Sequence, residues 1–124
     1  MRIRLAAAAL LVVITAALAG CVDQPDLPPD CGQANATRAA TLTATGLEPR
    51  DIGVCRGQQV ELSVQIQADG VLHIHGYDAE AKEVRVGQDV TFDFTADRVG
   101  QFVIELHTAD GGGVSAGVFT VHER

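Results

Sequence analysis

The chain has 124 residues and a formal net charge of −7, from nine Lys and Arg against 16 Asp and Glu. This length supplies one domain of ordinary size and is too short for two. An acidic surface repels phosphate backbones and anionic headgroups, so the charge argues against nucleic acid and anionic lipid as partners.

The first twenty residues have the layout of a secretory signal peptide. Arg2 and Arg4 carry positive charge, and an uncharged apolar run extends from residue 5 to residue 18. A run of this length is too short to span a bilayer as a stable helix. The run ends in Leu18-Ala19-Gly20-Cys21, which resembles the bacterial lipobox. The pattern predicts cleavage before Cys21 and acylation of its thiol, and the alternative is an ordinary secreted protein in which this cysteine is incidental.

Residues 21–38 are predicted to be the lipidated Cys21 and a flexible tether. They are rich in Pro, Asp and small residues and have little to bury, so we place one folded domain at residues 39–124. Removal of residues 1–20 from the 124 takes two of the nine basic residues with it. The remaining 104 residues then carry seven Lys and Arg against 16 Asp and Glu, a net charge of −9. The predicted location is extracytoplasmic, with a lipid anchor in the cell membrane, or in the outer membrane if the cell has one.

The three cysteines are expected to have two roles, acylation of one and a disulfide between the other two. If Cys21 is acylated, Cys31 and Cys55 are the two that remain, and both lie in an oxidising compartment. A disulfide between Cys31 and Cys55 is the simplest interpretation. The alternative makes them metal thiolates, but their separation lacks the Cys-x-x-Cys type of spacing that metal sites use.

From residue 39 onward, apolar residues recur at every second position, which is typical of half-buried strands. The clearest run is Val60–Ile66, and residues 90–94 and 102–106 repeat it. Gly-rich turn signals separate the runs, and no convincing helical period follows residue 18. Seven or eight short strands of this kind predict an all-β antiparallel sandwich. Weaker strands are predicted at residues 41–45, 52–55, 71–75, 83–86 and 114–121.

Three of the four histidines lie on two of these predicted strands. His73 and His75 are two residues apart, as are Glu105 and His107. Residues two apart on a strand share a face, so each pair projects to the side opposite its apolar neighbours. Imidazole nitrogens and carboxylate oxygens bind copper and zinc, so the pattern allows a metal site. The alternative to a metal site is that both strand faces are solvated and carry His by chance. The fourth histidine, His122, is interpreted as an exposed tail residue.

Tyr77 and Asp78 directly follow the first histidine pair. Asp78 is a candidate for orienting an imidazole from outside the set of ligands. Because Asp is a common turn residue, we prefer a turn that leaves the strand at this point.

Four segments together resemble the cupredoxin-like proteins found as bacterial lipoproteins and secreted domains. These segments are Gly57–Ile66, Val71–Asp78, Thr91–Asp97 and Gly100–His107. The first of them is similar to the Gly-x-x-Val lead-in to the family's first histidine strand. The resemblance covers roughly residues 40–122 and implies a cupredoxin-like Greek-key β-sandwich. Its motifs are more specific for this fold than for metal binding.

The ligands of the electron-transfer cupredoxins do not all carry over. In those proteins a Gly-x-Tyr/Phe-x-x-x-Cys strand supplies the copper thiolate, and counting from Gly100 and Phe102 places Leu106 at the cysteine position. The following loop, residues 108–113, contains neither the His nor the Met that the family uses there, and Met1 is the only methionine of the chain. A blue-copper centre is therefore excluded, and the family's first copper histidine falls at or near His73.

The first domain of multicopper oxidases is a closer match. His73-Ile74-His75-Gly76 is similar to its His-x-His-Gly strand, and the later Gly-x-x-x-x-His-x-His strand, counted from Gly100, falls on Glu105 and His107. The resemblance implies a mononuclear, non-blue copper site made by His73, His75, His107 and Glu105. Oxidase activity does not follow, because the oxidases need a second domain to complete their cluster.

We therefore expect a membrane-tethered module that binds copper for storage, delivery or sensing outside the cytoplasm. No nucleophile–base pair, carboxylate dyad or phosphate loop is recognisable, so we expect no enzyme activity. The alternative is a metal-free β-sandwich interaction domain with a degenerate copper site. A third hypothesis is an accessory subunit that completes a copper cluster with a partner protein.

Overall fold

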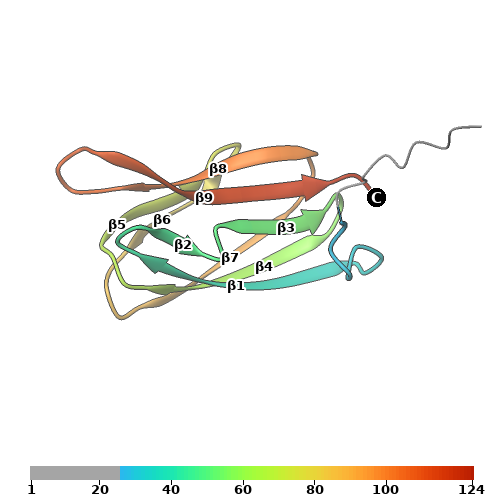
Figure 1. The fold of residues 1–124 in the computed structure, drawn as a ribbon, viewed down its shortest axis with the longest axis horizontal. Coiled ribbons are helices and arrows are strands. Elements are labelled where there is room, and N and C mark those ends of the chain that lie inside the picture. The colour runs from blue at the N-terminus through green and yellow to red at the C-terminus, as the bar shows by residue number, and fades with distance from the viewer. Residues whose placement is uncertain (1–25) are drawn as a thin grey trace, which may run out of the picture.

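The computed structural model describes residues 26–124, apart from the side chains of Asp78 and Ala79. The predicted signal peptide and Cys21 lie outside the described residues. Nine strands form two sheets that pack face to face (Figure 1). The strands are β1 (Asn35–Thr43), β2 (Gly46–Glu48), β3 (Asp51–Cys55), β4 (Gln59–Ile66), β5 (Gly70–Ile74), β6 (Tyr77–Val84), β7 (Asp89–Thr95), β8 (Gly100–His107) and β9 (Gly113–His122).

The strand order is β2-β1-β4-β7 in one sheet and β3-β9-β8-β5-β6 in the other. The predicted all-β sandwich is confirmed, with nine strands in place of seven or eight. The expectation of an antiparallel sandwich was wrong for two strand pairs, because β1 pairs with β4 and β3 pairs with β9 in parallel. The chain passes to the other sheet at β3 and returns at β4, so β4 runs beside β1 in the same direction. No helix among residues 26–124 is long and apolar enough to cross a membrane.

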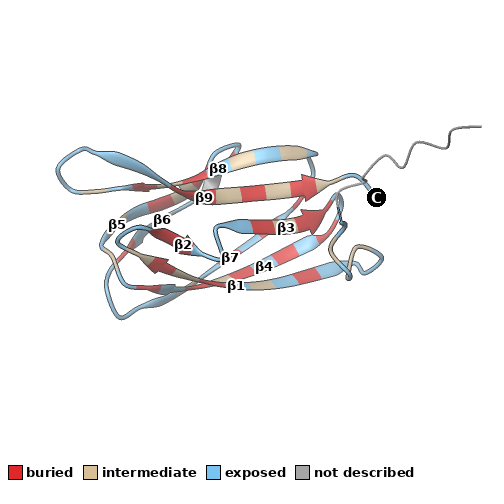
Figure 2. Cartoon of the chain, in the orientation of Figure 1, coloured by how far each residue is buried: buried red, intermediate tan, exposed pale blue. Residues whose placement is uncertain are grey.

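The core lies between the two sheets and is made by the inward half of each alternating strand (Figure 2). Tyr77 belongs to it, contrary to the expectation of a turn residue. The turn is made by Gly76, which has a φ of 81°, and Tyr77 is the first residue of the edge strand β6. Its ring packs against Phe94 and Phe102, with centroid distances of 4.9 and 5.1 Å. Tyr77, two residues after His75 in the sequence, therefore belongs to the aromatic cluster of the core.

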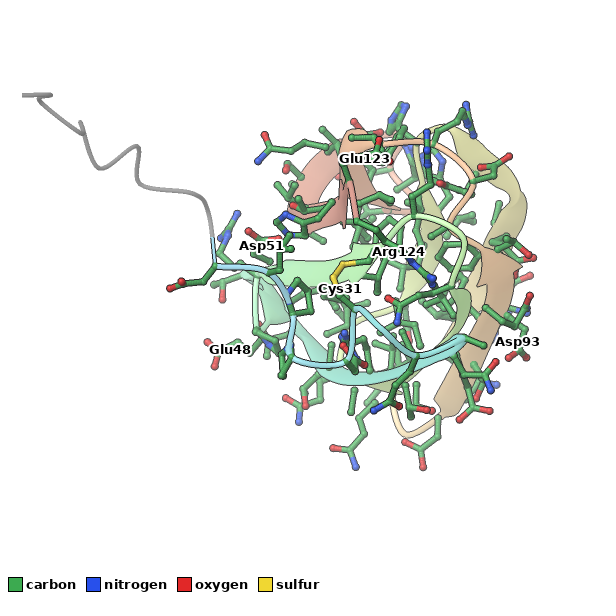
Figure 3. All side chains as sticks on the ribbon, turned by 90° about the vertical axis from the view of Figure 1, so that its right-hand side faces the viewer. Cys31, Glu48, Asp51, Asp93, Glu123 and Arg124 are labelled. Carbon is green, nitrogen blue, oxygen red and sulfur yellow. A yellow bond between two sulfur atoms is a disulfide. The ribbon has the colours of Figure 1, made fainter. Side chains whose placement is uncertain are left out.

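The segment before β1 is held against one end of the sandwich. A disulfide joins Cys31 to the buried Cys55. The fully buried Gln58 accepts the N–H of Cys55 at 2.7 Å and donates to the carbonyls of Asp30 and Gln33 at 2.9 and 3.2 Å. Arg124 also donates to the Gln33 carbonyl at 3.1 Å, so the C-terminus lies at this end too (Figure 3).

These contacts revise the expectation for residues 21–38. The guanidinium of Arg38 makes two hydrogen bonds of 2.8 Å to the carboxylate of Asp30, and β1 already begins at Asn35. The last four residues of the predicted tether are thus part of the sheet. The sequence reading missed them because Ala36 is the single small apolar residue that this stretch buries.

His122 was expected to be an exposed tail residue, and this was wrong. It is the last residue of β9 and pairs in register with Cys55 of β3. Its side chain is half-buried, and its Nε2 would lie 3.4 Å from a Cβ added at Gly53. The parallel pairing of β3 with β9 keeps the strand regular to this point, which a sequence ending in polar residues does not signal.

Candidate metal site

Two neighbouring strands of the five-stranded sheet place the candidate ligands. β5 and β8 run antiparallel, with His73 opposite Glu105 and Val71 opposite His107. The residues between them on both strands are buried in the core, so the ligand candidates project from the outer face of the sheet. His75 follows the end of β5, and its N–H donates to the Val103 carbonyl at 2.9 Å, which continues the pairing.

The three imidazole rings converge on one carboxylate oxygen of Glu105. Oε2 of Glu105 lies 2.9 Å from Nε2 of His75 and 3.1 Å from Nε2 of His107. Nε2 of His73 lies 3.5 Å from the same oxygen and 2.8 Å from Nε2 of His107. The imidazole rings are in contact as well, because the centroid of His73 lies 4.7 Å from that of His75 and 4.8 Å from that of His107. The structure thus brings together all four residues that the sequence singled out.

The cluster is open to solvent on one side. The side chains of His73 and Glu105 are 15% and 28% exposed, whereas those of His75 and His107 are 50% and 45% exposed. An ion held here would have its inner side against the sheet and its outer side accessible. A groove of about 320 Å³ borders the site, lined by Asp69, Gly70, Val71, Glu83, Val84, Arg85, His107, Thr108 and Ala109.

The histidines hold Glu105 in its ionised form. The hydrogen bond from His75 is the main cause that lowers the pKa of the Glu105 carboxyl below its ordinary value. Electrostatic interaction with His75, His107 and His73 acts in the same direction, and desolvation opposes it. The site therefore carries a carboxylate charge at neutral pH, which favours a cation.

The donor separations of His73, Glu105 and His107 fit a bound metal ion. With a metal–nitrogen bond of about 2.0 Å, two ligand atoms lie about 2.8 Å apart at a right angle and about 3.3 Å apart at the tetrahedral angle. The contacts among these three donors, from 2.8 to 3.5 Å, cover this range. Nε2 of His75 joins the group through its 2.9 Å contact with Oε2 of Glu105. The ligand atoms of His73, Glu105 and His107 all lie within 4.8 Å of one another. Three imidazoles and one carboxylate form a set that suits copper or zinc.

Among residues 26–124, no cysteine or methionine sulfur lies at the site. Leu106, which occupies the place of the blue-copper cysteine, is 3% exposed and points into the core. The histidine cluster lies on the opposite face of the same sheet. Cys31 and Cys55 are joined in the disulfide at the N-terminal end, and Met1 is the only methionine of the sequence.

Two irregularities of pairing flank the cluster. The register of β5 with β6 shifts between Leu72 and Ile74, around His73, and that of β8 with β9 shifts between Ile104 and Glu105. Bulges of this kind change the direction of side chains and are frequent beside functional sites. They also place Gly113 opposite His107, where an added Cβ would lie 3.1 Å from Nδ1 of the ring. Sequence reasoning missed this role of Gly113, because nothing marks it among the three glycines of its turn.

A larger groove lies on the outer face of the four-stranded sheet, away from this cluster. Its walls include Ala39, Thr41, Ser63, Gln65 and Thr91, with carboxylates at Glu48 and Asp89. It contains no His or Cys among its lining residues, so it offers no comparable metal chemistry.

No protein-family model and no curated protein matches the sequence. Solved structures do match it. The multicopper oxidase mgLAC superposes with a TM-score of 0.56 at 20% identity, over 72% of this chain and 40% of that one. The metal-binding domain of the Cu(I)-exporting P-type ATPase of Streptococcus pneumoniae, solved with Cu(I), gives 0.55 at 12% identity, over 73% of this chain and 89% of that one. Auracyanin from Roseiflexus castenholzii gives 0.52 at 16% identity, over 72% and 98%.

This chain spans about two fifths of the oxidase and nitrite reductase chains that it matches. At such identities the likeness establishes the architecture of the domain and leaves its function to the residues of the site.

Proposed function

Because the chain has a cupredoxin-like fold, we propose that it binds one copper ion through His73, His75, His107 and Glu105. One observation carries the proposal, namely that three imidazole nitrogens lie within 3.5 Å of a single carboxylate oxygen. Hydrogen bonds and ion pairs with Glu105 hold the three histidines together in the absence of an ion. A shared cation would hold them together as well, since it neutralises the carboxylate and accepts a lone pair from each ring.

Copper is favoured over zinc by two arguments. Divalent copper binds nitrogen and oxygen donors more tightly than zinc does in the ordinary order of metal affinities. Similar folds also occur in a copper nitrite reductase and in the domain of a Cu(I) exporter. The donor set lacks the thiolate of a blue centre, so the site is of the non-blue type.

The proposed role is storage, delivery or sensing of copper by a module tethered outside the cytoplasm. The tether is the segment that follows the predicted lipid attachment at Cys21. We propose a binding role for the site and not a catalytic one. Half-exposed His75 and His107 are suited to an ion that must enter and leave.

Titration of the untagged chain with Cu(II), followed by electron paramagnetic resonance, tests the proposal. We expect a tetragonal spectrum with nitrogen splitting, weak d–d absorption and no intense blue band. The double variant His73→Ala/His75→Ala should lose the signal while staying folded, because both side chains lie outside the core. His122→Ala, at the other end of β9, is the control that should bind normally.

Two results would contradict the proposal. Copper bound by the double variant as tightly as by the wild type would show that the histidine pair is not the site. If neither protein binds copper beyond weak surface adsorption, the alternative of a metal-free β-sandwich interaction domain remains.

A further inference from the structure

We propose that Glu105 makes this site selective for Cu(II) over Cu(I), so that copper is held in the oxidised state and released when it is reduced. The inference rests on the proposed copper binding and goes beyond it, since it assigns the oxidation state of the cargo, the residue that selects it and the event that releases it.

The donor atoms are the first argument. Soft thiolate and thioether sulfur select Cu(I), whereas imidazole and carboxylate are harder donors that suit a divalent ion. The cluster offers three imidazoles and one carboxylate. No sulfur is near it in the described part of the chain, because both cysteines there are tied in the disulfide. The fold itself does not decide the oxidation state, since the similar pneumococcal domain was solved with Cu(I).

The position of the charge is the second argument. Oε2 of Glu105 contacts all three imidazoles, so it lies at the centre of the cluster and not at its edge. Ion-pair energy scales with the product of the two charges, so this carboxylate attracts a 2+ ion about twice as strongly as a 1+ ion at the same distance. In logarithmic terms, Glu105 therefore contributes about twice as much to Cu(II) affinity as to Cu(I) affinity.

Release follows from the same difference. One electron from an external one-electron reductant converts bound Cu(II) to Cu(I), and no bond to the protein other than the metal–ligand bonds breaks. The resulting Cu(I) keeps half of the attraction to Glu105 and gains no soft donor. Because His75 and His107 are half-exposed, a Cu(I) acceptor can reach the ion from solvent.

The test compares the wild type with Glu105→Gln, which keeps the shape of the side chain and removes its charge. Cu(II) affinity is measured in air by competition with nitrilotriacetate, and Cu(I) affinity without oxygen by competition with bathocuproine disulfonate. We expect the substitution to weaken Cu(II) binding by at least about tenfold and Cu(I) binding by only about threefold. Glu61→Gln, an exposed carboxylate on β4 of the other sheet, is the matched control and should change neither.

A second readout uses the Cu(II)-loaded wild type alone. Addition of ascorbate with bathocuproine disulfonate should transfer the copper to the chelator as Cu(I), whereas the chelator without reductant should leave it bound. Equal weakening of both ions in Glu105→Gln, or copper that stays on the protein after reduction, would overturn the inference while leaving copper binding intact. Failure of the wild type to bind either ion would instead refute the proposed function.

Discussion

Gly113 faces His107 across the β8–β9 pair, and the imidazole ring occupies the space that a side chain would need. A Cβ at this position would lie 3.1 Å from Nδ1 and 3.2 Å from Cε1 of the ring. Gly113→Ala should therefore turn the ring of His107 away from Glu105 and weaken copper binding by at least about tenfold, as loss of support around a ligand commonly does. Copper titration with electron paramagnetic resonance measures the effect.

Gly112→Ala is the control for this substitution. The atoms nearest to its Cβ would be side-chain atoms of Asp110 and Thr108 within the turn, at 3.3 and 3.4 Å, whereas at Gly113 they belong to the histidine ring. Normal copper affinity in Gly113→Ala, or equal losses in both variants, would contradict a positioning role for Gly113.

At the scale of elements, the ion pair between Asp30 and Arg38 fastens the segment before β1 to the sandwich. Hydrogen bonding from Arg38 is the main cause that lowers the pKa of Asp30. A lowered pKa in the folded state stabilises the fold above the unfolded pKa, and the stabilisation disappears as pH falls through the folded pKa. Both side chains are about one fifth exposed, so solvent limits the contribution to about 1 kcal/mol.

Asp30→Asn should accordingly lower the free energy of unfolding by about 1 kcal/mol at pH 7. The difference from the wild type should begin to shrink below about pH 4, the ordinary pKa of an unfolded Asp, and should vanish below the lowered pKa of the folded Asp30 carboxyl. Urea unfolding at the two pH values measures it, and Asp26→Asn, an exposed residue of the same segment, is the control. An unfolding free energy equal to that of the wild type at pH 7, or a difference that persists unchanged in acid, would contradict a stabilising role for the Asp30–Arg38 ion pair.

The alternation of apolar and polar residues in the sequence predicted those strands that bury large apolar side chains on one face. β4, β7 and β8 were placed correctly for this reason, since each has a regular pattern of burial. The pattern failed for β2 and for the start of β1. β2 has three residues and lies where a turn was expected, and the start of β1 buries small side chains that give little signal.

Strand periodicity could predict the candidate residues but not their convergence, which was expected only from the resemblance to the first domain of multicopper oxidases. The period of a strand puts His73 with His75, and Glu105 with His107, on one face each. The strand period does not say that these two faces are adjacent, because β5 and β8 are separated by two other strands along the chain. The pairing of His73 with Glu105 depends on long-range register, which the core side chains on the opposite face of the sheet set.

At the scale of the whole molecule, the site and the C-terminus lie toward opposite ends of the described domain (Figure 1). The C-terminus and the segment that enters β1 lie at one end, and the β8–β9 turn, which follows His107 directly, lies at the other (Figure 1). A lipid carried by Cys21 would join the domain through the segment that the disulfide holds at the first end. The metal site would then be presented away from the point of attachment.

Cys21→Ser tests the attachment, since a serine hydroxyl cannot replace the thiol in the acyl transfer. The variant should be released or remain an uncleaved precursor, and it should take up no labelled palmitate, whereas the wild type should incorporate the label and partition with membranes. Cys31→Ser, which leaves the predicted lipobox intact, is the control and should still be labelled. Equal labelling of the wild type and Cys21→Ser would contradict the lipid anchor.

The central claim, that this sandwich carries copper at the outer face of its five-stranded sheet, is tested most directly by metal analysis of the exported protein. The untagged chain is purified from cells grown with copper and zinc, alongside the His73→Ala/His75→Ala variant, and elemental analysis is done without added metal. We predict copper in equimolar amount with the wild-type chain and none above background in the variant. A wild type that contains no copper, or a variant that contains as much copper as the wild type, would contradict the claim.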